Sequence, residues 1–347
     1  MDQTDRRIVQ CLLHDGRMSF RRIAQVVGVS EQTAARRYRA LVADGAVRVR
    51  ALPGPGRAGE QSWFVRVQCR PDATDALADA LAAREDTSYV SVTSGGSEIV
   101  CQTRSDPARP QGSVLQRLPR TAKVLGFHAY QVLHMHLGTD AKWRAFDGTL
   151  TPAQLAATQA PDPVDTMRDP DPARTTEAPD PSDLPPDHGE GPGVLRDSDA
   201  PLLAELARDG RAGVVELARS TGWTKARVSA RLEELLDERA LHMAVDLAYG
   251  RFGFHATAYL WLTVTPGRLH PTGETLSRHP ATTFAAAVTG SANLLVTVTC
   301  RTTDDLYAYV TGTVGAIPAI TQVDVVPVLN RLKQAGTRVR DGRLTPS

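Results

Sequence analysis

The sequence predicts an α+β fold in which a helical domain and a βαββαβ domain each occur twice in one chain. Three observations support this prediction. The chain contains an internal repeat at an offset of 194 residues, each copy opens with three short amphipathic helices, and each copy continues with strands and helices in the order of a split βαβ unit. A proline-rich acidic segment separates the copies.

Composition places the chain among ordinary soluble proteins. It has 347 residues, of which 41% are hydrophobic and 23% are charged, which is long enough for two or more domains with their own cores. No stretch of apolar residues is long enough to cross a membrane, and the charged start MDQTDRRIVQ lacks the apolar region of a secretory signal. We therefore expect a cytoplasmic protein.

The net charge of +1 hides an uneven distribution along the chain. Residues 151–195 hold ten of the 23 prolines and nine Asp or Glu against two Arg, which gives this segment a charge of −7, whereas residues 1–50 carry +5. A segment of this composition cannot bury enough apolar surface to fold, so we predict a disordered acidic linker over 151–195. The neutral total is therefore compatible with a nucleic-acid partner.

The repeat is clearest at the start of each copy. Residues 5–47 align without a gap on residues 199–241, and ten positions are identical, among them Gly28 and Gly222. A looser correspondence follows, in which SWFVRVQCRPD resembles AYLWLTVTPG and SGGSEIVCQTR resembles TGSANLLVTVTCR. One two-part module is thus written twice.

Each copy begins with a pattern typical of a helix-turn-helix. Asp5 is the expected cap of a first amphipathic helix, and a second helix is expected over about 19–26. Gly28 then permits the positive φ of a tight turn, and Ser30 caps a third helix. The corresponding residues of the second copy are Asp199, Gly222 and Thr224. The third helix of such a motif enters the major groove of DNA.

The third helix of each copy has one apolar and one basic face. Apolar residues recur at i, i+4 and i+7 and should face the domain core; they are Ala34, Tyr38 and Leu41, and Val228, Leu232 and Leu235. Arginine can grip guanine or phosphate with two hydrogen bonds, Gln and Thr can contact base edges, and the capping Ser and Thr are placed for phosphate. The predicted DNA-binding residues are Ser30, Gln32, Thr33, Arg36, Arg37, Arg39, Thr224, Lys225, Arg227 and Arg231.

A solvated basic face is the alternative explanation of these arginines. The glycine turns, the caps and the repeat together favour DNA binding over it. The second copy should bind more weakly or act mainly as a structural partner, because its helix ends in acidic residues that would repel phosphates; these are Glu233, Glu234, Asp237 and Glu238.

The second part of each copy predicts a ferredoxin-like βαββαβ domain. In the second copy the expected strands are 256–265, 283–289, 293–300 and 320–329, with helices over 267–278 and 303–313. The sheet face without helices needs a cover, which a second sheet could provide within the chain or between chains. The expected domains are helix-turn-helix over 1–52 and 196–246 and ferredoxin-like over 60–138 and 254–333.

These motifs resemble those of the leucine-responsive/asparagine-operon (Lrp/AsnC) family of transcriptional regulators, in a tandem-duplicated form. The matching segments are LLHDGR, the helix-turn-helix IAQVVGVS with its second version LARSTGWT, and FAAAVTGSANLLVTVTCR followed by DDLYAYV. The resemblance covers nearly the whole chain except 151–195 and the last few residues. It implies two winged helix-turn-helix domains, two ferredoxin-like ligand-sensing domains and sequence-specific DNA binding.

The resemblance also implies an effector, an amino acid or related small metabolite, bound near the interface between ligand-sensing domains. Carried over to this chain, the effector loop comprises Gly290, Ser291, Asn293 and Leu294. Asn293 stands where the family usually has an acidic residue, and Glu98 lies near the shortened loop of the first copy, so the loop is less suited to an ordinary α-amino acid. A β-hairpin turn without a ligand explains both loops equally well.

Two other functions compete with the regulator hypothesis. Sirohaem decarboxylases resemble the same architecture and also occur as fused pairs, but the nine histidines here are scattered and the signatures of those enzymes are not visible. The third hypothesis is a ligand-sensing partner protein with weak DNA binding, which the acidic end of the second recognition helix favours.

No metal site, cofactor or catalytic residue is predicted. His134 and His136 could place two imidazoles on one side of a strand, but no third ligand is apparent in the sequence. The four cysteines form no CxxC pair and are expected to be buried; they are Cys11, Cys69, Cys101 and Cys300. No P-loop, Rossmann fingerprint or nucleophile elbow is present.

The sequence therefore predicts a non-enzymatic transcriptional regulator of the Lrp/AsnC type. Its expected partners are double-stranded DNA, a small-molecule effector and a second module, either as an intrachain pseudo-dimer or as a homo-oligomer.

Overall fold

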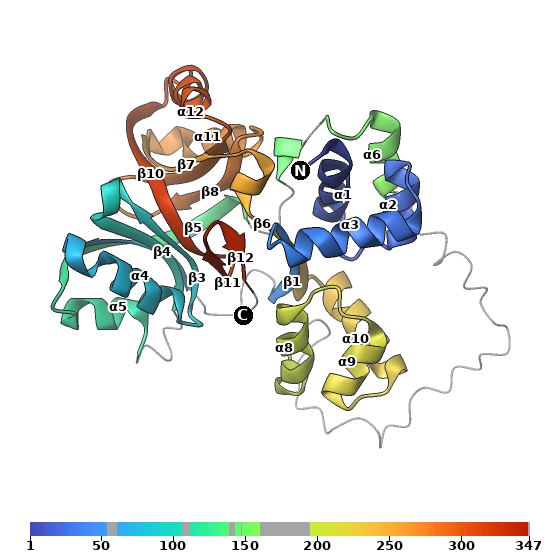
Figure 1. The fold of residues 1–347 in the computed structure, drawn as a ribbon. Helices are drawn as coiled ribbons and strands as arrows, with labels where there is room; N and C mark the ends of the chain where they lie inside the picture. Colours follow the sequence, from blue (N-terminus) through green and yellow to red (C-terminus); the bar gives the residue numbers. More distant parts are fainter. Residues whose placement is uncertain (54–60, 106–111, 139–142, 147, 160–194, 346–347) are drawn as a thin grey trace, which may run out of the picture.

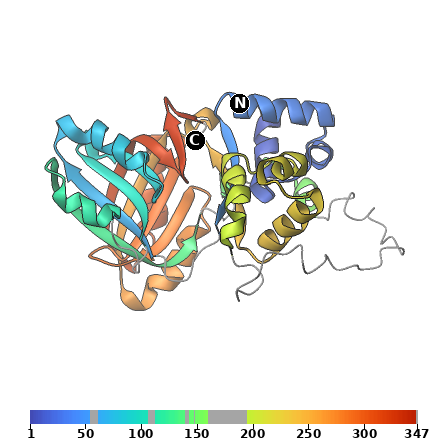
Figure 2. The same ribbon diagram turned by 90° about the horizontal axis from the view of Figure 1, so that it is seen from below.

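The computed structural model describes residues 1–53, 61–105, 112–138, 143–146, 148–159 and 195–345. Helical domains and sheet domains form two separate lobes, as Figures 1 and 2 show from two directions. No helix within these ranges is long and apolar enough to span a membrane.

The first helical domain has the expected three helices. They are α1 (Gln3–His14), α2 (Phe20–Val27) and α3 (Glu31–Ala43). Ser30 caps α3 by accepting a hydrogen bond from the Thr33 amide, and Gly28 has φ 80° in the turn before it, as predicted. Asp5 as the cap of α1 was wrong: Asp2 is the cap, and Asp5 lies in the first turn and completes a capping box with it.

The second helical domain repeats this arrangement with α8 (Ala200–Arg208), α9 (Val214–Thr221) and α10 (Lys225–Asp237). Gly222 has φ 73°, and Thr224 caps α10 by accepting from the Arg227 amide. The apolar residues predicted to face the two domain cores are all buried, and so are the four cysteines. Local sequence signals therefore predict the glycine turn and the cap before the third helix of each domain, whereas the Asp199 side chain makes no capping bond to α8.

The two helical domains are joined about a local twofold axis. Strands β1 (Val47–Pro53) and β6 (Leu241–Leu247) follow α3 and α10, and they pair with each other antiparallel, with Val47 opposite Leu247. At the 194-residue offset Val47 corresponds to Leu241 and Pro53 to Leu247. Each strand therefore pairs with its own counterpart, and the two winged helix-turn-helix units share one two-stranded ribbon.

A reciprocal pair of arginines repeats this symmetry. Arg17 donates to the carbonyl oxygens of Gly210 and Ala212, the latter at 3.0 Å. Its counterpart Arg211 donates to the carbonyl oxygens of the equivalent residues Gly16 and Met18, at 2.6 and 2.9 Å. The same residue types thus make the same contacts in both directions, as in the isologous interface of a dimer.

Both βαββαβ units form as predicted. The first consists of β2 (Gln61–Cys69), α4 (Thr74–Ala82), β3 (Thr87–Thr93), β4 (Glu98–Ser105), α5 (Val114–Arg117) and β5 (Val124–Leu137). The second consists of β7 (Ala256–Val264), α11 (Leu269–Ser277), β8 (Thr282–Val288), β9 (Leu294–Cys300), α12 (Thr303–Ala308) and β10 (Ile320–Gln334). The last strand extends to Gln334, beyond the expected end at residue 329.

The two sheets close into one ring of strands. The first half of β5 pairs with β2 of its own unit and the second half with β8 of the other. Strand β10 likewise pairs first with β7 and then with β3. The ring order is β10, β3, β4, β2, β5, β8, β9 and β7, closing on β10. Of the two pairings that the sequence left open, the chain adopts the one within itself.

Closure covers the apolar sheet faces. Tyr130 packs on Trp261 with ring centroids 4.4 Å apart, and Phe64 packs on Phe284 at 5.1 Å, in a cluster built from both units. On the outer face of each sheet the helices cover a separate core. The aromatic cluster between the sheets therefore holds the two copies together by burying apolar surface from both.

The linker predicted over 151–195 does not begin where expected. Helix α6 (Pro152–Gln159) packs on the first helical domain, where Gln154 donates to the Val26 carbonyl at 2.7 Å and Arg22 donates to the Ala157 carbonyl at 3.0 Å. The prediction was wrong for these first residues, because they form a helix that finds hydrogen-bond partners on α2. The rest of the predicted linker, 160–194, lies outside the described residues.

A hairpin after β10 packs on the first helical domain. Strands β11 (Thr337–Arg340) and β12 (Arg343–Leu344) form a hairpin after β10, and the Leu344 amide donates to the Gly45 carbonyl at 2.8 Å. Gly45 has φ 64°, and a Cβ atom there would lie 2.7 Å from the Leu344 carbonyl oxygen. Only glycine fits this contact.

Strand β10 also carries a buried cation at its end. The Lys333 residue is 6% exposed, and its ammonium group donates to the Arg84 carbonyl and to the Thr87 hydroxyl. No carboxylate within the described ranges lies at ion-pair distance from it. Burial lowers the pKa of Lys333 from 10.5 to about 8.

This shift predicts a pH dependence of stability. Below pH 8 the lysine is protonated in both the folded and the unfolded state, and the folded state carries the full cost of burying the charge. Between about pH 8 and 10.5 the folded state binds fewer protons than the unfolded state. The free energy of unfolding should therefore rise with pH over this range. Urea titrations of Lys333→Met over this range should lack that rise. Lys123→Met, at an exposed site, should keep it; equal slopes for the wild type and Lys333→Met would contradict the assignment.

Candidate functional site

Helix α3 presents a polar stripe on the face opposite the domain core. Gln32, Arg36 and Arg39 are exposed and follow one another at i, i+4 and i+7, which places them on one side of the helix. Among the described residues no carboxylate lies within ion-pair distance of Arg36. The stripe can therefore approach DNA without first breaking an ion pair of Arg36.

Two of the predicted DNA-binding residues at the start of α3 are engaged with each other. The Ser30 hydroxyl donates to the Thr33 hydroxyl at 2.8 Å and accepts from the Thr33 amide at 3.1 Å. Both hydroxyl groups lie at the N-terminus of the helix, where backbone amides and the helix dipole favour a phosphate. This end of α3 suits contact with the DNA backbone more than contact with bases.

Arg37 differs from the other arginines of α3. Its guanidinium bonds to the carboxylates of Asp2 and Asp5 at 2.6 and 2.9 Å, which ties α3 to the start of α1. These partners hold the pKa of Arg37 above its ordinary value. Arg37 therefore has a structural role, and its charge is not available for contact with DNA.

The second recognition helix has a different stripe. At the 194-residue offset the positions of Gln32, Arg36 and Arg39 are occupied by Ala226, Ala230 and Glu233, all exposed. Two methyl groups and a carboxylate can neither grip guanine nor neutralise phosphate. Helix α10 thus lacks the chemistry that α3 presents on the corresponding face.

The predicted residues of α10 are only in part available to DNA. Lys225 is exposed beside the capping Thr224, whereas the Arg227 guanidinium stacks 4.2 Å from the Trp223 ring centroid. Arg231 bonds to Asp199 at 2.6 Å and to Glu234 at 2.7 Å, and its side chain is 6% exposed. Arg231 cannot reach a duplex without unpacking the domain, so it too has a structural role.

The predicted effector loop is largely occupied by its own hydrogen bonds. The Asn293 side chain accepts from the Val264 amide at 2.8 Å and donates to the Val264 carbonyl at 2.7 Å. Leu294 is fully buried, and a Cβ atom on Gly290 would lie 2.8 Å from the Tyr130 ring. Ser291 alone among the four predicted residues presents an exposed side chain.

Glu98 occupies the position of Asn293 in the first copy and is equally engaged. Its carboxylate accepts from Arg66 at 2.8 Å and from the hydroxyls of Thr93 and Ser94 at 3.1 and 3.0 Å. Arg66 also reaches Asp324 on β10, at 2.7 Å. Both loop positions therefore stabilise the sheets, and neither offers a free group to a ligand.

A cavity of about 440 Å³ lies elsewhere, on the second ferredoxin-like unit. Its lining includes Phe254 before β7, Cys300 at the end of β9 and Tyr309 after α12. Its lining includes two groups of opposite charge, Arg301 and Asp305, and the apolar Phe254 ring. Burial lowers the pKa of His279 and raises that of Cys300 to about 11, so both side chains are neutral near pH 7. The volume falls within the range of roughly 300–1,000 Å³ that is typical of small-molecule sites.

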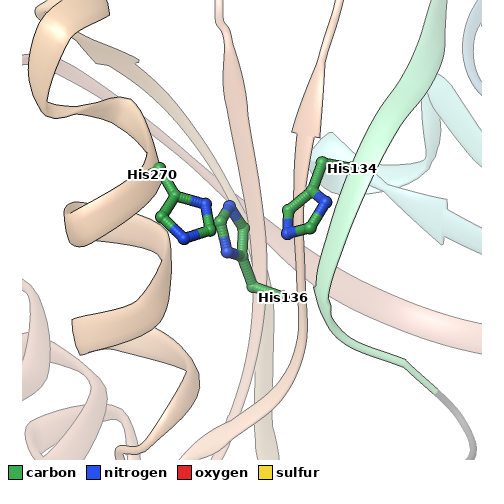
Figure 3. Close-up of side chains that lie close together, drawn as sticks. All are labelled: His134, His136 and His270. Carbon is green, nitrogen blue, oxygen red and sulfur yellow. The ribbon is translucent and has the colours of Figure 1, made fainter.

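Three histidines gather at a second place, between β5 and α11. One ring nitrogen each from His134, His136 and His270 lies within 4.8 Å of the other two, and Figure 3 shows the three side chains together. Burial lowers the pKa of His136 and outweighs the hydrogen bond to Glu274, which acts in the opposite direction. No sequence pattern points to His270, because this residue is distant from the pair along the chain and only the fold brings it near.

Comparison with known proteins identifies the family. The model of the AsnC-type helix-turn-helix domain matches residues 1–42, and that of the Lrp/AsnC ligand binding domain matches residues 257–337. An uncharacterized HTH-type transcriptional regulator of Pyrococcus furiosus is 31% identical over 104 residues, which cover 29% of this chain and 70% of that protein. This chain belongs to the Lrp/AsnC family of transcriptional regulators.

Two further comparisons bear on its relatives and its fold. The HTH-type transcriptional regulator FL11 of Pyrococcus abyssi is 27% identical over 141 residues, 40% of this chain and 93% of that protein. The crystal structure of the siroheme decarboxylase NirDL matches 99% of this chain and 95% of its own with a TM-score of 0.59 and 12% identity. At 12% identity, the similarity to the siroheme decarboxylase concerns the fold alone.

The two equivalent arginines provide a test of the structural roles given to them. Arg231→Met should lower the free energy of unfolding by about 3–5 kcal/mol, because Asp199, 1% exposed, loses its buried partner. Arg37→Met should cost about 0–1 kcal/mol, since its ion pairs are partly exposed. Urea denaturation measures both; a cost for Arg37→Met equal to or above that for Arg231→Met would refute the ranking.

Proposed function

We propose that this Lrp/AsnC protein is a sequence-specific DNA-binding transcriptional regulator in which one chain forms the equivalent of a dimer. The observation that carries the proposal is the exposed stripe of Gln32, Arg36 and Arg39 on the third helix of a helix-turn-helix. Arg and Gln side chains on such a helix can make paired hydrogen bonds to guanine and adenine in the major groove.

The tandem-duplicated arrangement is part of this proposal. It is supported by the repeat at 194 residues, by the pairing of β1 with β6 and by the reciprocal contacts of Arg17 and Arg211. These contacts fix two helix-turn-helix heads about one axis, as a twofold dimer does for the two halves of an operator.

The two heads have unequal roles in this proposal. Helix α3 contacts bases, with Ser30 and Thr33 near phosphate. Helix α10 contributes at most backbone contacts through Thr224 and Lys225, and its main role is to support the first head. The operator of a single chain should therefore carry its sequence information in one half.

DNA binding tests the proposal directly. A duplex enriched from a random-sequence pool serves as the probe in fluorescence anisotropy titrations at several salt concentrations. Arg36→Ala should weaken binding about 10- to 100-fold, the loss expected for one base-contacting arginine. The control Arg120→Ala, an exposed arginine of the first ferredoxin-like domain, should leave affinity unchanged. Equal effects of the two variants, or affinity that does not fall with added salt, would refute the proposal.

We also infer that an effector binds in the 440 Å³ cavity and not in the glycine loop. Arg301 and Asp305 could answer the carboxylate and ammonium groups of an amino acid or a similar zwitterion. The loop positions, by contrast, have their polar groups satisfied within the protein.

Thermal unfolding in the presence of each of the twenty amino acids distinguishes these sites. A bound effector raises the melting temperature because it binds only the folded state. Arg301→Ala should abolish that rise and Ser291→Ala should leave it intact. The reverse pattern would indicate that the effector binds in the glycine loop. If no amino acid raises the melting temperature, an amino-acid effector is refuted.

One observation favours a second function, a sirohaem decarboxylase-like enzyme: the fold similarity extends over nearly the whole chain. A tetrapyrrole with several carboxylates requires several cationic groups and a proton donor in one site. Among the described residues that line the cavity, Arg301 is the one permanently cationic side chain, and burial favours the neutral form of His279. Release of carbon dioxide from added sirohaem would favour this second function over the first.

A further inference from the structure

The three histidines meet where the two copies of the module join. His134 and His136 belong to the part of β5 that has left its own sheet and pairs with β8 of the second copy. Helix α11 of the second copy packs against both β8 and β5 and carries His270 in its first turn. In Figure 3, His134 and His270 extend from opposite sides toward His136.

The spacing of the imidazoles is close to that of metal ligands. Ring centroids lie 4.7 Å apart for His134 and His136, and 5.3 Å apart for each of these with His270. A tetrahedral ion with metal–nitrogen bonds of about 2.0–2.1 Å needs ligand nitrogens roughly 3.3 Å apart. The rings of His134 and His270 are exposed, so small side-chain rotations can close the remaining gap.

His136 is the fixed member of the cluster. Its side chain is 1% exposed, its Nδ1 lies 3.3 Å from the Glu274 carboxylate, and its Nε2 is buried without a hydrogen-bond partner. A carboxylate on one ring nitrogen orients the imidazole and leaves the other nitrogen as the ligand, an arrangement typical of metal-binding histidines. Coordination would satisfy the buried nitrogen, which otherwise lacks a partner.

A glycine makes room for this ring. Gly273 lies inside α11, and a Cβ atom there would lie 2.2 Å from His136 Nε2. Glycine weakens a helix, so its presence at this position is explained by the close approach of the imidazole. Ring, glycine and carboxylate thus form a preformed support on one side of the cluster.

We propose that His134, His136 and His270 form a binding site for a divalent transition-metal ion of the Zn²⁺ type, with Glu274 as the positioning residue for His136. Imidazole nitrogens suit Zn²⁺ and its neighbours, whereas Mg²⁺ and Ca²⁺ prefer oxygen ligands. Three protein ligands leave a fourth position for water or a small ligand. Because the ligands come from both copies, the ion links β5 to α11.

Isothermal titration of the full chain with zinc chloride, after removal of metals by a chelator, tests the site. The wild type should bind one ion per chain. His134→Ala and His270→Ala should each weaken binding more than about tenfold, and because both side chains are exposed, circular dichroism should show an unchanged fold. The matched control His128→Ala, exposed on the same strand, should bind as the wild type does.

Cobalt(II) provides a second readout that a purely structural role would not change. The wild type should give the intense visible bands of four-coordinate Co²⁺, and His134→Ala should not. Absence of stoichiometric Zn²⁺ binding by the wild type would overturn the proposal, as would an equal loss in His128→Ala and His134→Ala. Neither assay contains DNA, so the outcome does not depend on the proposed regulator function.

Discussion

The pairing of β1 with β6 is the constraint on which the remaining architecture depends. It joins each helix-turn-helix to its counterpart through the strand that follows the recognition helix, and Arg17 and Arg211 add hydrogen bonds across the same axis. Beneath the ribbon, the buried Arg50–Asp246 ion pair, 3.1 Å long, also engages Thr337 of β11 and so connects the helical lobe to the sheets. A buried pair of this kind favours one arrangement because separating the charges leaves each unsatisfied.

The two helical domains on this frame share a buried or partly buried ion pair and differ on their outward faces. The ion pair of Asp5 with Arg37 recurs as that of Asp199 with Arg231. The outward stripe, in contrast, changes from Gln and two Arg to two Ala and Glu. Nearly equal folds therefore carry unequal electrostatics, with a basic first head and a second head that is close to neutral.

Much of the fold could be predicted from sequence because its signals are local. Caps such as Ser30 and Thr224, the turn glycines and the apolar spacing of the third helices depend on neighbours within a few residues. The closed ring of strands, helix α6 on the first domain and His270 beside His136 depend on distant segments and leave no local trace. The structural role of Arg231 could have been predicted from the repeat. Arg231 and its partner Asp199 are both identical to their counterparts, Arg37 and Asp5.

We propose that one chain carries two heads on a twofold frame and reads bases with the first head alone. Selection of binding sites from random DNA, with the mass of the complex measured on the selected duplex, tests it most directly. The selected site should be asymmetric, with the sequence preference in one half and one chain bound. A palindromic site with equal preference in both halves, bound by a single chain, would contradict it.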